Sequence, residues 1–469
     1  MFLQTEGDYN FSSGSRGRGN LSSTANPYFL FPQIYNFRYN IYSSEWPVAN
    51  RAIELYLQKK SENEGWERQI NGLSNNEKAN LLLEKHTFKE LLADVEQRNL
   101  QNNIVGLEAS RLFARSEINM GVDAFRDSLY AMLKRNTFLN IKFENMLDTL
   151  GEMSRTDLYS YLKEWEQLTP LPFYSIGEPE LTKVVNKGGE EFFVLKVLVS
   201  NNSDYDGIIQ MNVLQNGWWY QPMEDPRARK KVEIAAHTSK EFVSVWEEQI
   251  RDVEINTMVS GNLPYMIRQS IGNVKQERNK IVKDTIYTLP ESSLEMPGEV
   301  IVDNEDSTLF VLSTPAVVGL LPKWLDKVED TSFKYSGISW WRAPLQWTAT
   351  TNAKYYGKYI RSAYVIKSGD GSQTATWKIP VPEAGQYELY YHVFKDDELR
   401  WNDRLQGEYH FRVAYDSEME DAYINLRKAN EGWEQLGTYY FSADTVRVVL
   451  TDECKLRSVT ADAVKIVKR

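Results

Sequence analysis

The sequence predicts a multidomain α+β protein with an N-terminal helical domain, a small middle β-sandwich and a C-terminal antiparallel β-sandwich of jelly-roll-like form. The chain has 469 residues, which is too many for one ordinary hydrophobic core. Apolar residues recur at helical spacing in the first third, and short runs typical of strands, bounded by turn residues, fill the remainder. Hydrophobic residues make up 42 % and aromatic residues 13 % of the chain, so each part can bury a core.

Helical periodicity and two prolines set the bounds of the predicted helical domain. Residues 1–46 are rich in Gly and Ser and are expected to form a loop-rich N-terminal segment. The helical domain spans 47–170, where apolar residues such as Ile53 and Leu91 recur every three to four positions. It ends at Pro170 and Pro172, because two prolines in three residues cannot lie inside a helix.

The period then changes to that of strands. Residues 171–290 contain short apolar runs and are predicted to form the small middle β-sandwich, with a charged stretch inside it, 275–283, that could be a helical link. A proline-bounded joint precedes the C-terminal sandwich at 297–469. In that domain, Gly385 is expected at a turn, with Tyr387, Leu389 and Tyr391 on one strand face.

Charge and composition exclude several classes of protein. The net charge of −11 and the pI near 5.2 disfavour nucleic acid as a partner, since phosphate backbones need a basic face. The single Cys454 excludes an intramolecular disulfide. No apolar stretch is long enough for a transmembrane helix, and the N-terminus lacks the pattern of a signal peptide. We therefore expect either a cytoplasmic protein or, preferably, a piece of a longer one.

The C-terminal domain contains a series of short motifs whose order is distinctive. They are VDNED at 302–306, SWW at 339–341, YYGKY at 355–359, ATW at 375–377, PEAGQYELY at 382–390, WEQLG at 433–437 and ADAVKIV at 461–467. In this order they resemble the golvesin/xanthan-lyase carbohydrate-binding-like domain, an accessory β-sandwich of bacterial polysaccharide lyases, amidases and peptidases. The resemblance covers about 299–469 and is interrupted by an apparent insertion at 307–334.

Residues 47–290 resemble a second family, the gluzincin peptidases of the aminopeptidase-N type, in the region after their zinc site. The resemblance lies in the segments 121–129 and 143–147, and in Trp165 before a β-domain. The family's zinc motif, His-Glu-x-x-His, is absent, and His86 is followed by Thr-Phe-Lys. Without two histidines four residues apart on a helix, this chain is not expected to hydrolyse peptides by the family's mechanism.

Five aromatic residues are the candidate ligand-binding residues of the C-terminal domain. Flat rings can pack against the C–H faces of a sugar, and a polar ring atom can bind its hydroxyls. The adjacent Trp340 and Trp341 cannot both point inward on a strand, so one of them should be exposed. The competing interpretation is that these rings pack in the sandwich core or between domains. The candidates are Trp340, Trp341, Tyr355, Tyr356 and Trp401.

No catalytic or transition-metal site is predicted. Cys454 follows Asp452 and Glu453, and acidic neighbours raise the pKa of a thiol, whereas a nucleophile needs a low one. No Gly-x-Ser-x-Gly elbow or phosphate-binding loop occurs. Calcium is the one metal ion considered, at acidic clusters such as Asp303, Glu305 and Asp306, although solvated loops are the favoured interpretation because EF-hand spacing is absent.

These observations favour a non-catalytic accessory or binding protein of the bacterial cell envelope, on its periplasmic or extracellular side. A polysaccharide or other glycan is the expected ligand, and an upstream membrane or catalytic segment is a possible associate. The alternative is that the chain is the C-terminal part of a larger envelope hydrolase, aminopeptidase-like, or of a lyase. A third hypothesis is a scaffold in which every aromatic residue lies between domains and no ligand binds.

Overall fold

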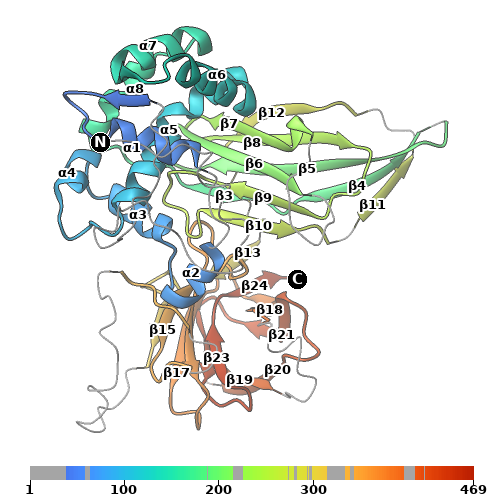
Figure 1. Cartoon of the computed structure of the whole chain (residues 1–469). Helices are drawn as coiled ribbons and strands as arrows, with labels where there is room; N and C mark the ends of the chain where they lie inside the picture. Colours follow the sequence, from blue (N-terminus) through green and yellow to red (C-terminus); the bar gives the residue numbers. More distant parts are fainter. Residues whose placement is uncertain are drawn as a thin grey trace, which may run out of the picture.

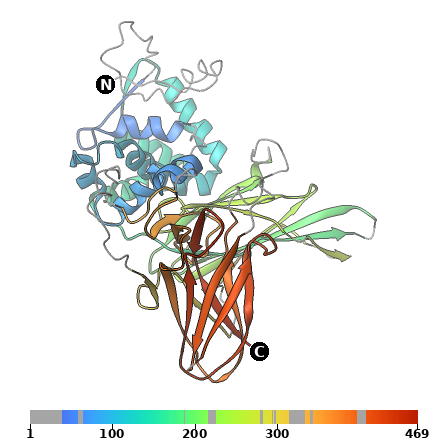
Figure 2. The same ribbon diagram turned by 90° about the horizontal axis from the view of Figure 1, so that it is seen from below.

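The computed structural model describes residues 39–58, 64–186, 188–214, 225–272, 274–278, 282–292, 294, 298–313, 333–338, 343–395, 407–416 and 418–469. Figure 1 shows a helical region beside a wide sandwich of strands, with a second sandwich below both. Figure 2 shows the strands of the lower sandwich running alongside one another, away from the helices. The predicted multidomain α+β fold class is confirmed.

The helical region is organised around its longest helix. Helix α5 (Gln101–Met120) buries Ile104, Leu112 and Phe113 against α1, α3, α6 and α7. Trp165 is 1 % exposed in the same core. The other helices are α1 (Ala49–Leu57), α2 (Glu64–Asn71), α3 (Asn75–Leu83), α4 (Phe88–Ala93), α6 (Val122–Arg135), α7 (Phe143–Ser154), α8 (Leu158–Lys163) and the 3-10 turn η3 (Glu164–Glu166). Within the described part of the chain, none of the helices combines the length and the apolar character that crossing a membrane requires.

One short strand pair lies where a loop was expected. Within the segment predicted to be loop-rich, β1 (Tyr39–Tyr42) pairs in parallel with β2 (Leu139–Lys142). Ile41 and Ile141 of this pair are buried in the helical core, which supplies the free energy that a four-residue strand lacks on its own. The pairing joins residues 100 positions apart, so no local pattern signals it.

The middle domain is a sandwich of two sheets that enclose Val197, Phe242 and Val253. One sheet has the order β10-β9-β6-β7 and the other β11-β4-β5-β8-β12, with β3 added to β5. Residues 275–278 of the charged stretch lie in strand β11, parallel to β4, so the prediction of a helical link is wrong there. The elements are β3 (Tyr174–Ile176), β4 (Glu180–Val185), β5 (Glu191–Asn201), β6 (Gly207–Leu214), η4 (Pro226–Ala228), β7 (Arg229–Ile234), β8 (Thr238–Trp246), β9 (Asp252–Asn256), β10 (Met266–Ser270), β11 (Val274–Arg278) and β12 (Thr285–Pro290).

The C-terminal sandwich packs a four-stranded sheet, β13-β24-β18-β21, against a five-stranded sheet, β14-β17-β22-β19-β20. A smaller sheet, β15-β16-β23, lies at the junction with the other domains. The strands are β13 (Glu299–Val302), β14 (Phe310–Leu312), β15 (Thr348–Thr351), β16 (Ser362–Lys367), β17 (Thr374–Pro380), β18 (Gly385–Val393), β19 (Glu408–Tyr415), β20 (Glu418–Asn425), β21 (Gly432–Phe441), β22 (Thr445–Thr451), β23 (Ser458–Ala461) and β24 (Val464–Lys468).

All three domains meet in one small apolar cluster. It combines Leu73 of the helical domain and Leu263 of the middle domain with Tyr335 and Ala349 of the C-terminal domain. Beside this cluster, the Thr351 hydroxyl donates to the Gly72 carbonyl at 2.7 Å. The backbones also lie in close contact there, because a Cβ on Gly337 would overlap the backbone of Ile70. A chain that packs this closely across its domain boundaries leaves little freedom for relative motion.

Two buried polar contacts join the helical and middle domains. Tyr265 donates its hydroxyl proton to Glu64 at 2.6 Å, and both side chains are buried. Lys231 of β7 forms an ion pair with Glu117 of α5, with side chains 6 % and 3 % exposed, respectively. The carboxylate of Glu117 also accepts the Tyr56 hydroxyl at 2.8 Å. The buried charges of Lys231 and Glu117 therefore neutralise each other within the chain.

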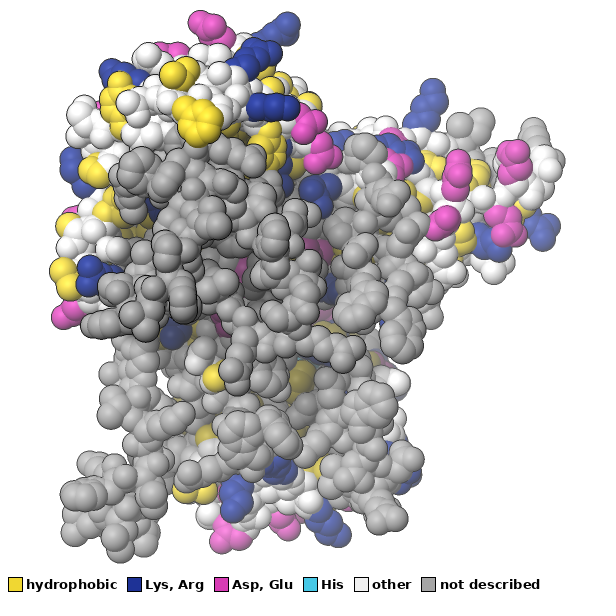
Figure 3. All heavy atoms as spheres, viewed as in Figure 1, with side chains coloured by type: hydrophobic (Ala, Val, Ile, Leu, Met, Phe, Trp, Pro, Cys, Tyr) yellow, Lys and Arg dark blue, Asp and Glu magenta, His cyan; other side chains and the backbone are white. Residues whose placement is uncertain are grey.

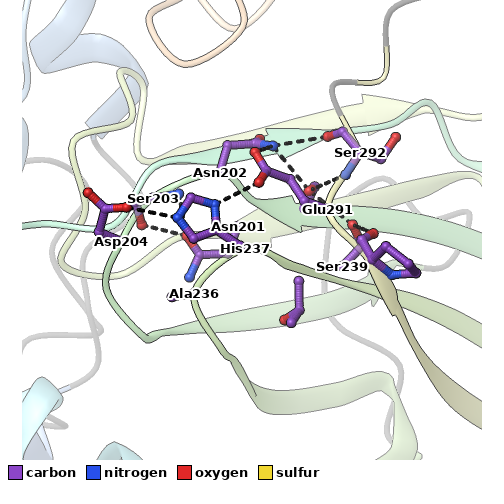
Figure 4. Close-up of polar contacts among 12 residues, drawn as sticks. Asn201, Asn202, Ser203, Asp204, Ala236, His237, Ser239, Glu291 and Ser292 are labelled. Carbon is purple, nitrogen blue, oxygen red and sulfur yellow. Dashed lines mark hydrogen bonds and ion pairs between the residues drawn. The ribbon is translucent and has the colours of Figure 1, made fainter.

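A histidine ties the start of the joint between the two sandwiches to the middle domain. Figure 4 shows His237 between two carboxylates, with Nε2 2.8 Å from Asp204 and Nδ1 2.7 Å from Glu291. Asn202 donates to Glu291 and to the carbonyl of Ser292, so the same group holds the chain just beyond β12. The hydrogen bonds with Asp204 and, second in size, with Glu291 raise the pKa of His237. The hydrogen bond from the Asn202 amide and, second in size, the bond with His237 lower the pKa of Glu291.

Stability should depend on pH through this histidine. Because its pKa is higher in the folded chain, protonated His237 contributes stability below its unfolded pKa, and that contribution disappears as pH rises through the folded pKa. His237→Gln should therefore lower the melting temperature at about pH 5.5 and change it little at about pH 9. Lys358 is the other charged group that acts on Glu291.

Thermal unfolding of the full chain at the two pH values measures this difference. His86→Gln is the matched control, because His86 is exposed and has no ion pair among the described residues. An equal effect of His237→Gln at both pH values would show that the charge on the imidazole does not hold the joint.

Candidate functional site

Strand β18 sets which side chains of the C-terminal domain face solvent. Tyr387, Leu389 and Tyr391 are fully buried between the sheets, as the alternation predicts. Tyr390 and His392 therefore lie on the outer face of the sheet. The register places His392 directly opposite Trp433 of β21, so both rings share that face.

Three rings meet at one end of this outer face, and we call Tyr356, His392 and Trp433 the ring cluster. The centroid of Trp433 is 5.0 Å from that of Tyr356 and 5.2 Å from that of His392, and the planes of Trp433 and His392 are 78° apart. All three side chains are half-buried. Aromatic pairs at this separation and tilt are mutually attractive, so the rings hold one another in place.

Lys465 borders the ring cluster, and a second ion pair is formed by neighbours of its residues in the sequence. Lys465 of β24 places its ammonium 4.9 Å from the ring centre of Trp433 and 2.7 Å from a carboxylate oxygen of Glu299. Lys354 and Glu431, close in the sequence to Tyr356 and Trp433, pair at 3.0 Å. The cluster thus combines apolar ring surface with hydrogen-bond donors and acceptors at its rim.

A buried carboxylate lies beneath the cluster and fixes its parts. Asp462 is 0 % exposed and accepts the backbone N–H of Tyr356 at 3.2 Å and a bond from His392 Nδ1 at 2.9 Å. Burial raises the pKa of Asp462, and the neighbouring His392 opposes that shift.

Further charges lie close to Asp462. Burial raises the pKa of Asp303 well above its usual value, and the charge of Asp462 raises it further. Burial lowers the pKa of Arg361, while Glu178 and Asp462 act in the opposite direction. Arg361 also donates to the carbonyl of Ala353 at 2.8 Å, in the loop that carries Tyr356. These groups form a polar layer that holds the loop against the sheet.

The structure separates the five predicted ligand-binding residues. Tyr356 belongs to the ring cluster. Tyr355 is 6 % exposed and packs 4.7 Å from Phe394, which is the core packing that the competing interpretation describes. Trp340, Trp341 and Trp401 lie outside the described residues.

His392, Trp433 and Lys465 are members of the site that sequence reasoning missed. Strand alternation already places His392 on the face opposite to Tyr391, and that signal was available. The pairing of His392 with Trp433 depends on a register shift between Leu389 and Tyr390, which no local pattern reveals.

The acidic cluster considered for calcium has other partners. Glu305 pairs with Lys334 at 2.6 Å and accepts the Tyr335 hydroxyl at 3.1 Å, and Asp306 accepts the backbone N–H of Thr308 at 3.0 Å. In the described ranges, no group of three or more His, Cys, Asp and Glu side chains could hold a metal ion. Calcium remains a prediction.

Comparison with known proteins identifies the family of one domain. The model of the Golvesin C-terminal domain family matches residues 341–468, so the predicted likeness of this domain to golvesin is confirmed. A search of curated proteins finds no match. The likeness of residues 47–290 to gluzincin peptidases stays a prediction.

Several solved structures are similar to parts of this chain, with low sequence identity and low TM-scores. Paenibacillus xanthan lyase is 17 % identical over 64 % of this chain and 27 % of its own, with a TM-score of 0.26. The CBM35 of Cellvibrio japonicus Abf62 is 12 % identical over 24 % of this chain and 75 % of its own, with a TM-score of 0.17. Bacteroides uniformis beta-glucuronidase 2 is 11 % identical over 66 % and 31 %, with a TM-score of 0.18. The chain thus spans about a quarter, 27 %, of the xanthan lyase.

Proposed function

We propose that the chain is a non-catalytic polysaccharide-binding protein of the cell envelope, and that its golvesin-type C-terminal domain holds a glycan at the ring cluster. The observation that carries this proposal is the group of Tyr356, His392 and Trp433 on the outer face of β18 and β21. The family match over residues 341–468 supports it, because all three residues lie within the matched range.

The chemistry of the cluster suits a sugar. A pyranose has a face of C–H groups that packs against an aromatic ring and a rim of hydroxyls that need donors and acceptors. The ring of Trp433 can pack against the C–H face of the sugar. Lys465, Glu299 and the hydroxyl of Tyr356 are close enough to that ring to bind the sugar's hydroxyls.

The site is also held in place before a ligand arrives. Asp462 bonds at once to the loop of Tyr356 and to His392, so the two rings cannot separate without breaking a buried hydrogen bond. A preorganised site loses less conformational entropy when it binds, which favours affinity.

Trp433→Ala in the full chain should weaken glycan binding about tenfold or more, because burial of an aromatic side chain contributes about 1.5–3 kcal/mol. A glycan array that includes neutral and charged polysaccharides identifies a ligand, and titration of that ligand measures the loss. Tyr440→Ala is the matched control, since Tyr440 is on the same strand and 66 % exposed but outside the cluster.

Two further results decide the outcome. The Trp340→Ala, Trp341→Ala double variant tests the predicted residues outside the described part of the chain. If Trp433→Ala binds as well as the wild type while the variant keeps its melting temperature, the ring cluster is not the binding site. If the folded wild-type chain binds no polysaccharide on the array, the proposed function is wrong.

A further inference from the structure

The other side of the C-terminal sandwich carries a group of positive charges that the fold does not explain. On the outer face of the five-stranded sheet, Lys378 of β17 lies directly opposite Arg447 of β22. Arg412 of β19 is on the same face, one row along, opposite Val449. Their neighbours Trp377, Val448 and Val413 are fully buried, which confirms that the three cations point away from the core. We call Lys378, Arg412 and Arg447 the cationic strip.

This arrangement is unfavourable for the isolated protein. Like charges directly opposite each other on neighbouring strands destabilise a sheet. None of the three cations has an ion pair with any residue that the structure describes, and Nε of Arg412 has no hydrogen-bond partner there. The chain has 65 acidic residues and a net charge of −11, and Figure 3 shows acidic and basic side chains interspersed among the coloured residues of the face in view. Among the described residues, Lys378 and Arg447 therefore lack a compensating charge, whereas Asp421 lies directly opposite Arg412 on β20 and is engaged with His410.

An exposed aromatic ring lies on the same face, one row beyond Arg412. Tyr423 of β20 stacks on His410 of β19 with ring centroids 4.9 Å apart and planes 10° apart, and yet Tyr423 is 58 % exposed. One face of the phenol ring is therefore covered by the imidazole, and the other is open to solvent. His410 is itself held by Asp421 at 2.8 Å and by Glu453 at 3.3 Å. Asp421 and Glu453 are therefore both engaged with His410.

We propose that this face binds an acidic polysaccharide, with one sugar ring on Tyr423 and the carboxylates of uronic acid residues at the cationic strip. On β19, His410 lies opposite Tyr423 and Ala414 lies opposite Arg447. These positions are four residues apart, so the distance along the strand is about 13 Å. An extended chain can therefore contact the ring and the cations together. Guanidinium groups bind carboxylates through two parallel hydrogen bonds, which suits Arg412 and Arg447.

This proposal is independent of the ring cluster. Trp433 is on the four-stranded sheet and Arg447 on the five-stranded sheet, whose inner faces pack together, so the two sites lie on opposite sides of the sandwich. A variant of one site should leave binding at the other unchanged. The two proposals can thus fail separately.

Titration of the full chain with polygalacturonate tests the cationic strip. The Lys378→Gln, Arg447→Gln double variant should lower the affinity about tenfold, and Tyr423→Ala about fivefold, because each removes contacts of a different kind. Binding by the wild type should weaken as salt is raised from about 50 to about 500 mM, since exposed ion pairs are screened. The double variant should melt at the same temperature as the wild type or higher, because its cross-strand repulsion is gone.

The controls distinguish recognition at the cationic strip from general attraction between opposite charges. Lys367→Gln removes an exposed cation from β16 in another sheet and should bind polygalacturonate as the wild type does. Wild-type affinity in the double variant overturns the proposal, as does a complete absence of polygalacturonate binding by the wild type. Equal binding of the neutral glucan laminarin would show that charge does not select the ligand, and it overturns the proposal too. Equal binding of duplex DNA would show that the face attracts any polyanion, with the same consequence.

Discussion

Asp462→Ala is expected to lower the free energy of unfolding by about 3 kcal/mol or more, the largest effect we predict for a single residue of the site. The carboxylate is fully buried and accepts the N–H of Tyr356 and a bond from His392. Removing it leaves both groups without their acceptor, at about 1–3 kcal/mol for each unsatisfied buried group. Arg361 also loses one of the two carboxylates that act on it, the other being Glu178.

Urea denaturation of the full chain measures this loss. Asp462→Asn keeps an oxygen for the Tyr356 N–H and should cost less than half as much, which separates hydrogen bonding from the volume of the side chain. Asp421→Ala removes an acid of the same domain that is mostly exposed, and it should change the unfolding midpoint little. A stable Asp462→Ala chain would mean that the loop of Tyr356 is held by other contacts.

Lys231→Met should destabilise the contact between the helical and middle domains by about 3–5 kcal/mol, because it leaves the buried carboxylate of Glu117 without a counterion. The second change Glu117→Gln should recover most of this loss. Glutamine carries no charge and still offers an oxygen to the hydroxyl of Tyr56, which donates to Glu117 in the native chain.

The comparison with a surface pair provides the control. Lys89 and Glu166 are 2.8 Å apart in the same domain, but both side chains are substantially exposed, so Lys89→Met should have little effect on the unfolding midpoint. Should Lys231→Met prove as mild as Lys89→Met, water must reach the interface and solvate Glu117.

The sequence was sufficient to predict the fold class because, in the longer elements, the pattern of apolar residues shows which face is buried. Helix α1, which contains Ile53, and strand β18 each have an apolar face that recurs with the period of the element, and that signal does not depend on the partner. Strands β1 and β11 were missed for the opposite reason. Each has only four or five residues and pairs in parallel with a distant strand, so its stability comes from tertiary contacts.

Only part of the candidate site could be predicted, and the difference again lies in what is local. Tyr356 is in a conspicuous aromatic motif, so composition alone selects it. Tyr355 is in the same motif but packs inward, and nothing in the sequence distinguishes the two neighbours. Trp433 and His392 are 41 positions apart and meet only through strand register. The cationic strip is hidden in the same way, since Lys378 and Arg447 are far apart in the sequence.

The close backbone contact at Gly72 and Gly337 also determines how the chain can use a bound ligand. A module on a flexible linker samples many orientations, and the length of that linker sets its effective concentration near a neighbouring site. Here the helical and C-terminal domains have no such linker at their contact, so a fibre bound to the sandwich would pass the helices at one fixed angle and distance. The spacing between them is thus a property of the fold, and a single methyl group at Gly337 would be enough to change it.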